Sequence, residues 1–340
     1  MKIGIVNDVP MIVEVLRRVL AEHSDHQLIW VAQNGEQAAE MCAWQLPDIV
    51  LMDLIMPKVD GVEATRRIMQ ATPCPILIVT SDIGANIGKV YEALGHGALD
   101  VVATPTLSSD DAQSGAATIL MAKIEQLSRM EQAPSVLLKA ATPVRAEKAD
   151  ASTKLVAIGA SAGGPAALAE LLKQLPQDFP AAIVIVQHID AAFSPGMADW
   201  LQQQTSLEVR LAKEGDQAQK GLVLMAGTSH HLLMKTGETL GYAEESPMDV
   251  YHPSIDVFFN SVVEKWRGKV IGVLLTGMGR DGALGLKAMH TSKHHTIVQD
   301  QKSCSVYGMP KAAVALNAAT EVLALTAIAP RLIELLDPRE

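Results

Sequence analysis

The sequence is poor in cysteine, in aromatic residues and in long apolar runs. It holds 3 cysteines in 340 residues, and their number and spacing fit neither a disulfide framework nor a metal site. We therefore expect Cys42, Cys74 and Cys304 to be buried free thiols. No apolar run reaches the roughly 18–20 residues of a membrane span, so direct membrane insertion is not expected. The N-terminal residues lack the form of a secretory signal, which favours a cytoplasmic location.

Positive charge is also scarce. Lys and Arg total 28 against 38 Asp and Glu, which gives a net charge of −10. The acidic excess lies mainly in residues 1–120, where 7 basic residues accompany 15 acidic ones. Because the chain has neither a basic stripe nor a recognition-helix pattern, nucleic-acid binding is not expected.

Two series of short apolar runs, each alternating with amphipathic segments, make up most of the chain. Such alternation predicts parallel strands covered by helices, hence an α/β fold with two doubly wound parallel-sheet domains. We assign the first domain to residues 1–120, a linker to 121–152 and the second domain to 153–340. A helix over about 115–130 is expected to precede the Ala-, Pro- and Ser-rich stretch 131–152.

The expected strands and helices can be placed by residue number. The first domain has strands at 2–6, 27–33, 48–52, 75–80 and 98–103, with helices at about 11–21, 35–46, 61–71 and 85–94. The second has strands at 155–159, 181–187, 208–212, 223–227, 270–275 and 296–300, and a hairpin at 230–243. Its helices are expected at about 165–175, 195–204, 253–266, 282–291 and 310–317.

Polar residues follow the strands of the first series. Asn7 and Asp8 end one strand, Asp53 follows the run IVLM, and Thr80 ends another. The carboxyl ends of parallel strands converge on one crevice, and two carboxylates with an amide suit Mg²⁺. Taken singly, Asp8 and Asp53 could equally cap the segments that follow them.

The motifs IVND, LMDLIMPKVDG, VTS and GALDVVATP occur in this order over residues 1–105. Together they resemble the receiver domain of two-component response regulators, which has a flavodoxin-like fold. The resemblance implies that Asp53 accepts a phosphoryl group and that Asp8, Asp53 and the backbone carbonyl of Ile55 hold Mg²⁺. It also implies that Thr80 is the switch hydroxyl.

Three positions depart from the receiver pattern. Thr104 stands where receivers usually carry a lysine, Val101 replaces the usual aromatic residue, and Asn7 replaces one acid of the common acidic pair. A threonine hydroxyl carries no charge to pair with a phosphorylated aspartate. Our hypothesis is that Asp53 is still phosphorylated, but that the switch is slower or differently coupled.

A second set of polar residues follows the strands of the second series. Ser161 lies in GASAG, which fits the nucleophile-elbow pattern G-x-S-x-G between a strand and a helix. Such a turn can also bind phosphate or a dinucleotide, although G-x-G-x-x-G and G-x-x-x-x-G-K-[ST] are both missing. His188 closes the run IVIVQ, and Asp281 ends a glycine-rich turn after another strand.

Hydroxyl, imidazole and carboxylate at three strand ends favour a hydrolase with an activated serine. The order Ser161, His188, Asp281 excludes the α/β-hydrolases, in which the acid precedes the histidine. Singly, His188 could be a structural histidine and Asp281 could be the N-cap of the next helix. The paired histidines at 230–231 and 294–295 lack matching acids and are expected to be loop or surface residues.

The blocks GASAGGP, VQHI, YHPSIDVFF, LLTGMGRDGA and YGMPKAA span residues 155–315. They resemble the catalytic domain of the chemotaxis response regulator protein-glutamate methylesterase family (CheB), and the DVVATP form resembles its Wsp-type branch. The resemblance implies a Rossmann-like methylesterase domain that hydrolyses glutamyl methyl esters, releases methanol and deamidates glutamines. It also implies that the backbone N–H of Met278 donates to the oxyanion, whereas Ala162 replaces a frequent threonine.

The family further implies its partners. The substrate would be the cytoplasmic domain of a methyl-accepting chemoreceptor, and a CheA-type histidine kinase would donate the phosphoryl group. The receiver would cover the catalytic cleft until Asp53 is modified, and the esterase chemistry would need no cofactor. The principal alternative is a non-enzymatic adaptor that competes for phosphate. A DNA-binding response regulator is disfavoured by the acidic second half and by the missing helix-turn-helix pattern.

Overall fold

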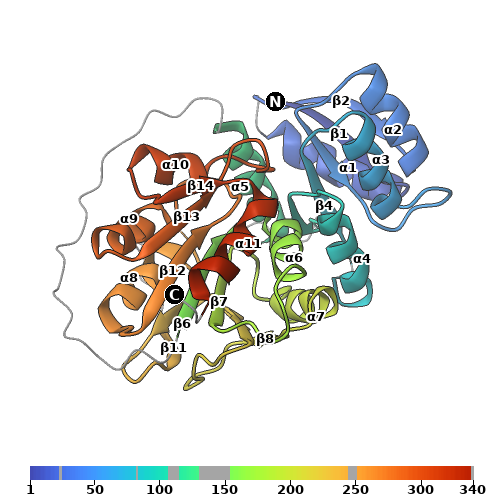
Figure 1. The fold of residues 1–340 in the computed structure, drawn as a ribbon. Coiled ribbons are helices and arrows are strands. Elements are labelled where there is room, and N and C mark those ends of the chain that lie inside the picture. The colour runs from blue at the N-terminus through green and yellow to red at the C-terminus, as the bar shows by residue number, and fades with distance from the viewer. Residues whose placement is uncertain (23–24, 82, 106–114, 130–153, 244–250, 338–340) are drawn as a thin grey trace. The chain divides into compact units, whose positions relative to one another are not determined.

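The computed structural model describes residues 1–22, 25–81, 83–105, 115–129, 154–243 and 251–337 (Figure 1). It separates into two compact units, Met1–Ala133 and Pro134–Glu340. Residues 130–153, which hold most of the expected linker, lie outside the described residues. Among the described helices, none combines the length and the apolar character that crossing a membrane requires.

The first unit is a five-stranded parallel sheet in the order β2-β1-β3-β4-β5. Its strands are β1 (Lys2–Val6), β2 (Gln27–Ala32), β3 (Ile49–Met52), β4 (Ile76–Thr80) and β5 (Asp100–Ala103). Its helices are α1 (Pro10–Ala21), α2 (Gly35–Trp44), α3 (Gly61–Ala71), α4 (Ile83–Gly95) and α5 (Ala116–Arg129). Helices α1 and α5 pack together, and α2, α3 and α4 form the other layer. This is the flavodoxin-like order, with its switch point between β1 and β3.

Local sequence accounts for where these helices start. Asn34 Oδ1 accepts a hydrogen bond from Gln37 N and caps α2, and Asp60 Oδ1 accepts one from Glu63 N and caps α3. All four residues of β3 are buried, so the strand delivers Asp53 to the carboxyl edge of the sheet.

The second unit is a seven-stranded parallel sheet in the order β14-β13-β12-β6-β7-β9-β8. Its strands are β6 (Lys154–Ala160), β7 (Ala182–Gln187), β8 (Glu208–Leu211), β9 (Leu222–Met225), β12 (Lys269–Leu274), β13 (His295–Gln299) and β14 (Glu321–Leu323). An antiparallel hairpin of β10 (His231–Met234) and β11 (Leu240–Ala243) stands apart from the sheet.

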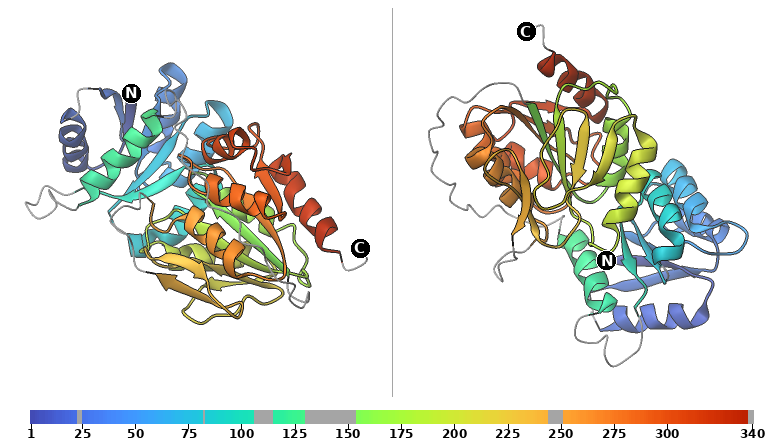
Figure 2. Two further views of the ribbon diagram at one scale, coloured as in Figure 1. Left: turned by 90° about the vertical axis from the view of Figure 1, so that its left-hand side faces the viewer. Right: turned by 90° about the horizontal axis from the view of Figure 1, so that it is seen from below.

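Helices cover both faces of this sheet (Figures 1 and 2). One layer holds α8 (Ile255–Lys265), α9 (Ala283–Thr291) and α10 (Met309–Ala315); the other holds α6 (Gly164–Leu172), α7 (Ser194–Gln204) and α11 (Leu325–Leu336). The predicted pair of doubly wound α/β domains is thereby confirmed. The sheet grows from β6 in one direction through β7 and in the other through β12, so its switch point lies at β6.

The core of the second unit is built from the apolar strand residues and the inner faces of α8 and α9. Phe258 and Phe259 are fully buried on α8. The three cysteines are free, but only Cys42 and Cys74 are buried. The expectation of burial is wrong for Cys304, which is partly exposed because it lies in a loop after β13.

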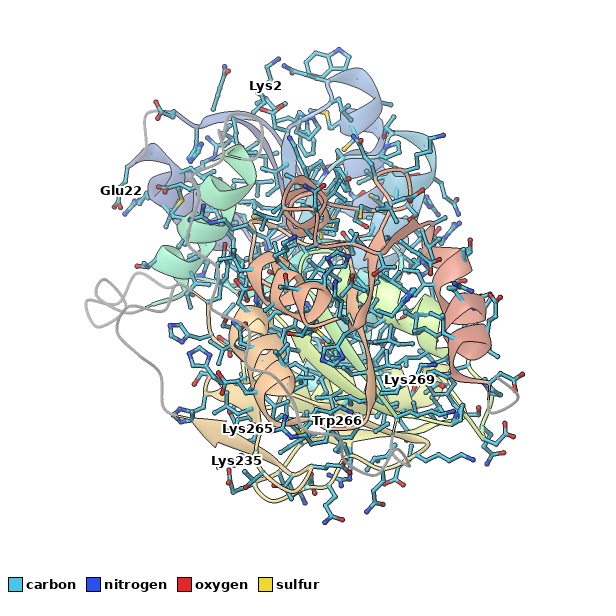
Figure 3. All side chains as sticks on the ribbon, turned by 60° about the vertical axis from the view of Figure 1, so that its left-hand side comes forward. Lys2, Glu22, Lys235, Lys265, Trp266 and Lys269 are labelled. Atoms are coloured by element: carbon cyan, nitrogen blue, oxygen red, sulfur yellow. The ribbon has the colours of Figure 1, made fainter. Side chains whose placement is uncertain are left out.

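Two C-terminal elements, β14 and α11, are absent from the sequence-based expectations. Strand β14 has three residues and lies at the edge of the sheet, and α11 contains Pro330. Lys154 donates a hydrogen bond to the carbonyl oxygen of Leu336 at 2.8 Å. Lys269, which is labelled in Figure 3, donates one to the carbonyl oxygen of Leu335 at 2.6 Å. These ammonium groups satisfy the open C-terminal carbonyls of α11 and complement its dipole.

Candidate functional site

Ser161 lies in a tight turn between β6 and α6. Its backbone N–H donates to Thr276 O at 3.1 Å, and its carbonyl accepts from Gly164 N at 2.7 Å. The turn requires Gly163, whose φ of 74° is in the left-handed region. Ser161 is 8% exposed, at the carboxyl edge of the sheet and at the N-terminus of α6. The strand–turn–helix geometry predicted from G-x-S-x-G is therefore present.

His188 follows β7, the neighbour of β6. Its backbone N–H donates to Ala160 O at 3.0 Å, which fixes it beside the serine turn. Its ring atom Nε2 lies 2.8 Å from Asp281 Oδ2. Nδ1 is thus the ring nitrogen left to face a hydroxyl. In the described residues no hydrogen bond joins Ser161 Oγ to His188, and such bonds often tighten only in the substrate complex.

Asp281 follows β12, the other neighbour of β6, and accepts four hydrogen bonds. The donors are His188 Nε2, the hydroxyl of Ser254 at 2.9 Å, and the backbone N–H groups of Ile255 and Asp256 at 2.6 and 3.0 Å. Burial alone would raise the pKa of Asp281, but the hydrogen bond and charge of His188 with these N–H groups lower it. Asp281 is therefore a carboxylate at neutral pH.

The reading of Asp281 as the N-cap of the helix that follows it does not hold. The N-cap of α9 is Gly282, without a side-chain cap, whereas Asp281 accepts from the first N–H groups of α8. In return, Asp256 in the first turn of α8 accepts from Gly285 N of α9 at 2.6 Å. Burial and the charge of Asp281 raise the pKa of Asp256 to about 7. The two acids hold the two helix N-termini together.

The expectation of a loop or surface residue is wrong for His231, which lies on β10 and supports Asp281 through Ser254. It is buried, and its Nδ1 accepts a hydrogen bond from Ser254 N at 3.0 Å. Ser254 thereby links the histidine to Asp281. In the sequence, Ser254 and Asp256 mark a capped helix start. They entered our sequence-based expectations only as part of a helix beginning at about residue 253.

Met278 lies in the turn from Gly277 to Asp281. A Cβ on Gly277 would lie 2.8 Å from Ser161 Cβ, so this turn abuts the serine. Within the described residues, the N–H of Met278 donates to no protein acceptor. The N–H of Ala162 is likewise unused within them. Both groups are free to stabilise negative charge beside Ser161.

Gln187 is a residue that the sequence reasoning missed. Its side-chain Nε2 donates to the carbonyl oxygens of Ser161 and His188, at 2.9 and 3.1 Å. It therefore ties together the two strand ends that carry hydroxyl and imidazole. A polar residue that closes a wholly apolar strand was the available signal.

The polar residues of the first unit gather at the carboxyl edge of its sheet. Asp8 follows β1 and Asp53 follows the adjacent strand β3, where Asp53 N donates to Val6 O at 2.9 Å. Thr80 ends the next strand, β4, and is buried. The structure therefore places Asp8, Asp53 and Thr80 on three consecutive strands of the sheet, as predicted. Thr104 N donates to Thr80 O at 2.9 Å, so the backbones of these two residues are joined where β4 and β5 end.

The donor set at this edge fits Mg²⁺. Asp53, whose Oδ1 accepts from Leu54 N at 2.7 Å, would supply one carboxylate. Asp8 would supply a second carboxylate, and the carbonyl of Ile55 a third oxygen. Within the described residues, no group of three or more His, Cys, Asp or Glu side chains is arranged for a metal ion, so two carboxylates with backbone and water oxygens would form the site.

Burial raises the pKa of Asp53 to about 6, against the backbone hydrogen bonds of Leu54 and Ile55, and the charge of Asp8 raises it further. Between the unfolded value near 4 and pH 6, the folded state keeps a proton that the unfolded state has lost, so stability falls as pH rises. Asp53→Asn should therefore stabilise the protein at pH 7.5 by on the order of 1–2 kcal/mol. The gain should vanish below pH 4.

Calorimetric unfolding of the full chain in EDTA checks this pH dependence. The exposed Asp48, whose Oδ2 accepts from Lys2 N, provides the control: Asp48→Asn should give no stabilisation at either pH. A stability gain for Asp53→Asn that persisted unchanged at pH 4 would contradict the electrostatic cause. Added Mg²⁺ should reduce the difference in stability between Asp53→Asn and the wild type at pH 7.5, since a cation relieves the repulsion between Asp53 and Asp8.

Two family models match the chain. Residues 156–332 match the CheB methylesterase model, and residues 3–110 match the response regulator receiver domain. Relatives of similar length include a protein-glutamate methylesterase/protein-glutamine glutaminase of Pseudomonas syringae, 57% identical over 98% of this chain and 99% of its own. Another, of Cupriavidus pinatubonensis, is 55% identical over 98% of this chain and 97% of its own.

The second unit also resembles a solved structure. The CheB methylesterase catalytic domain of Thermotoga maritima is 34% identical, with a TM-score of 0.52, over 54% of this chain and 99% of its own length. The unit that carries Ser161, His188 and Asp281 is therefore similar to a methylesterase domain in sequence and in fold.

Proposed function

Because the chain belongs to the CheB methylesterase family and carries a response regulator receiver domain, we propose that it is a phosphorylation-regulated protein-glutamate methylesterase and protein-glutamine glutaminase. Its substrates are glutamyl methyl esters, and selected glutamines, on the cytoplasmic domain of a methyl-accepting chemoreceptor. Its phosphodonor is a histidine kinase of the CheA type.

One observation carries the catalytic assignment. Nε2 of His188 lies 2.8 Å from the buried carboxylate of Asp281, and both residues follow the strands that flank the one ending at Ser161. A hydrogen-bonded imidazole and carboxylate beside a serine on a strand-to-helix turn are the parts of an activated nucleophile.

The chemistry follows from these positions. Ser161 Oγ attacks the ester carbonyl, and His188 accepts the hydroxyl proton on Nδ1 while Asp281 stabilises the imidazolium. The N–H of Met278 donates to the oxyanion. Collapse breaks the C–O bond, and His188 returns the proton to the departing methanol. Water then attacks the acyl-enzyme with His188 as base, which releases the glutamate and restores Ser161. For glutamine, the leaving group is ammonia.

The receiver supplies the regulation. Asp53 takes the phosphoryl group, with Asp8, Asp53 and the carbonyl of Ile55 as the Mg²⁺ ligands and Thr80 as the switch hydroxyl. Bound Mg²⁺ would neutralise charge that develops on the transferred phosphoryl oxygens. Thr104 offers the phosphorylated aspartate no ammonium where a lysine is usual, which supports our hypothesis of a slower or differently coupled switch. In this proposal, phosphorylation of Asp53 raises the esterase rate.

The non-enzymatic adaptor is not favoured, because relatives named for the enzymatic activity match nearly the whole chain. A cytoplasmic location follows from the proposed substrate, since the reacting glutamates lie on the cytoplasmic domain of a receptor. Membership of the Wsp-type branch, and with it a role in surface sensing, remains our prediction.

Methanol release from a methyl-labelled receptor tests chemistry and regulation together. We expect the full chain to release methanol, and a small-molecule phosphodonor with Mg²⁺ to raise the rate at least about tenfold, the effect of roughly 1.4 kcal/mol. Asp53→Asn should keep the basal rate and lose the stimulation. Equal stimulation of the Asp53→Asn variant by the phosphodonor would show that Asp53 is not the acceptor. If no methanol were released under any condition, the non-enzymatic adaptor would be the remaining interpretation.

A further inference from the structure

The aromatic ring of Tyr251 lies against the imidazole of His188. The two ring centroids are 5.0 Å apart and the planes differ by 9°, the geometry of an offset parallel stack. Tyr251 is partly buried, and the side chain of His188 is 14% exposed. One face of the imidazole is therefore covered by an aromatic ring while its edge meets Asp281.

The hydroxyl of the same tyrosine reaches the turn that carries the N–H of Met278. A Cβ on Gly279 would overlap Tyr251 Oη, and φ at Gly279 is 78°, so this close approach requires glycine. The backbone of Arg280 also interacts with the phenol oxygen. Tyr251 thus contacts both the histidine and the turn from Gly277 to Asp281.

We propose that Tyr251 is a positioning residue, whose ring holds the His188 imidazole in register with Ser161 and favours the imidazolium formed during the reaction. The inference rests on the proposed function. The hydrogen bond to Asp281 fixes one edge of the imidazole but leaves the ring free to tilt, and the stack removes that freedom. A cation over an aromatic face is stabilised, most strongly where water is excluded.

The phenol is suited to this place because it stays neutral. Burial, with the negative charge of Asp281, raises the pKa of Tyr251 above its ordinary value. A neutral ring can cover the ion pair of His188 and Asp281 without adding a competing charge, and its bulk keeps water from the pair.

Two substitutions separate the ring from the hydroxyl. Tyr251→Phe keeps the stack and should retain at least about half of kcat. Tyr251→Leu removes it and should lower kcat roughly 5- to 30-fold, the range of such aromatic interactions, with KM for the methylated receptor changed less than about twofold. Tyr242, whose hydroxyl donates to Ala212 O, is the matched control: Tyr242→Leu should lower Tm but leave kcat within about twofold.

Three kinetic outcomes would overturn the proposal: unchanged kcat in Tyr251→Leu, a rise of KM alone, or an equal loss in Tyr251→Phe and Tyr251→Leu. A rise of KM alone would mark a substrate contact, and an equal loss would mark the hydroxyl as the active group.

A second measurement does not depend on activity. In proton NMR of the full chain, the His188 ring signals, identified by their loss in His188→Gln, should lie upfield because of the Tyr251 ring current. They should move downfield in Tyr251→Leu and stay in Tyr251→Phe. Signals that do not move would overturn the stack itself. If the wild type released no methanol while this pattern held, the proposed function would fail and the positioning of His188 would stand.

Discussion

Ser161→Ala is expected to reduce methanol release by about 10⁴- to 10⁶-fold, the usual cost of losing a nucleophile that acts with a base and an acid. This corresponds to about 6–8 kcal/mol of barrier. His188 and Asp281 would stay paired, but no hydroxyl would be present to attack. Residual activity would reflect binding and the free N–H of Met278, which can still polarise the ester carbonyl.

The same substitution should leave stability nearly unchanged. Ser161 contributes its backbone to the fold, through Thr276 O and Gly164 N, and both bonds survive in alanine. Alanine also keeps the Cβ that packs against Gly277. We expect the free energy of unfolding to change by less than about 1 kcal/mol, so lost activity cannot be ascribed to unfolding.

Methanol release measured with labelled receptor, beside a denaturation curve, checks both expectations. Ser292→Ala is the matched control, since Ser292 is the C-cap of α9 through its backbone N–H, which alanine keeps. It should keep full activity. A Ser161→Ala protein that released methanol at a tenth or more of the wild-type rate would remove Ser161 from the mechanism and return the chain to the adaptor reading.

The three catalytic residues of this mechanism could be predicted from the sequence because a parallel sheet places the residues that follow its strands at one edge. Each buried strand is an apolar run, and the polar residue that ends the run lies at the carboxyl edge. Ser161, His188 and Asp281 each follow such a run, and the structure brings β6, β7 and β12 side by side. The same rule found Asp53 in the first unit.

The supporting residues could not be found in this way. Ser254, Asp256 and Tyr251 act through contacts between the start of α8 and the turn after β12, which are separated by more than twenty residues of sequence. The periodicity of apolar residues along the chain predicts helices and strands, but it does not predict contacts between segments this far apart in the sequence. For the same reason, the sequence left Asp281 open as a cap of its own helix, when it caps a helix that precedes it in the chain.

The C-terminal elements were missed for a different reason. Strand β14 has only three residues, two partly buried and one exposed, and the apolar residues 322–325 continue from it into α11 without a turn signal. In α11, Pro330 interrupts an otherwise amphipathic pattern, and a proline inside such a pattern predicts the end of a helix. The helix is held instead by tertiary contacts, with Lys154 and Lys269 at its C-terminal carbonyls.

Substitution of Asp281 is expected to damage both catalysis and stability, because its carboxylate serves both. Asp281→Ala would leave the N–H groups of Ile255 and Asp256 without their acceptor at the buried start of α8. We expect a loss of about 2–4 kcal/mol in the free energy of unfolding. Asp216→Asn is the control: Asp216 pairs with Arg210 away from the triad, and its loss should cost about 1 kcal/mol or less and spare kcat.

Asp281→Asn separates the two roles more sharply. The amide oxygen can still accept from Ser254 and Asp256, but the NH₂ group then faces Ile255 N and His188 Nε2. To avoid two opposed donors, His188 must carry its proton on Nδ1, the nitrogen that should take the proton of Ser161. The wrong tautomer alone lowers kcat by about 10⁴ in serine proteases, and we expect a similar loss here.

The pH dependence of kcat in Asp281→Asn distinguishes a role of Asp281 as a helix cap alone from a role in orienting the imidazole of His188. If Asp281 acted only as a cap, kcat of the folded Asp281→Asn protein, measured well below its Tm, would approach that of the wild type. If it also orients the imidazole, the defect should persist at every pH between 6 and 9, because the tautomer is set by the amide and not by a titration. Recovery of kcat to within about tenfold at any pH would contradict that role, whereas a persistent loss would place the acid of the triad at the junction of α8 and α9.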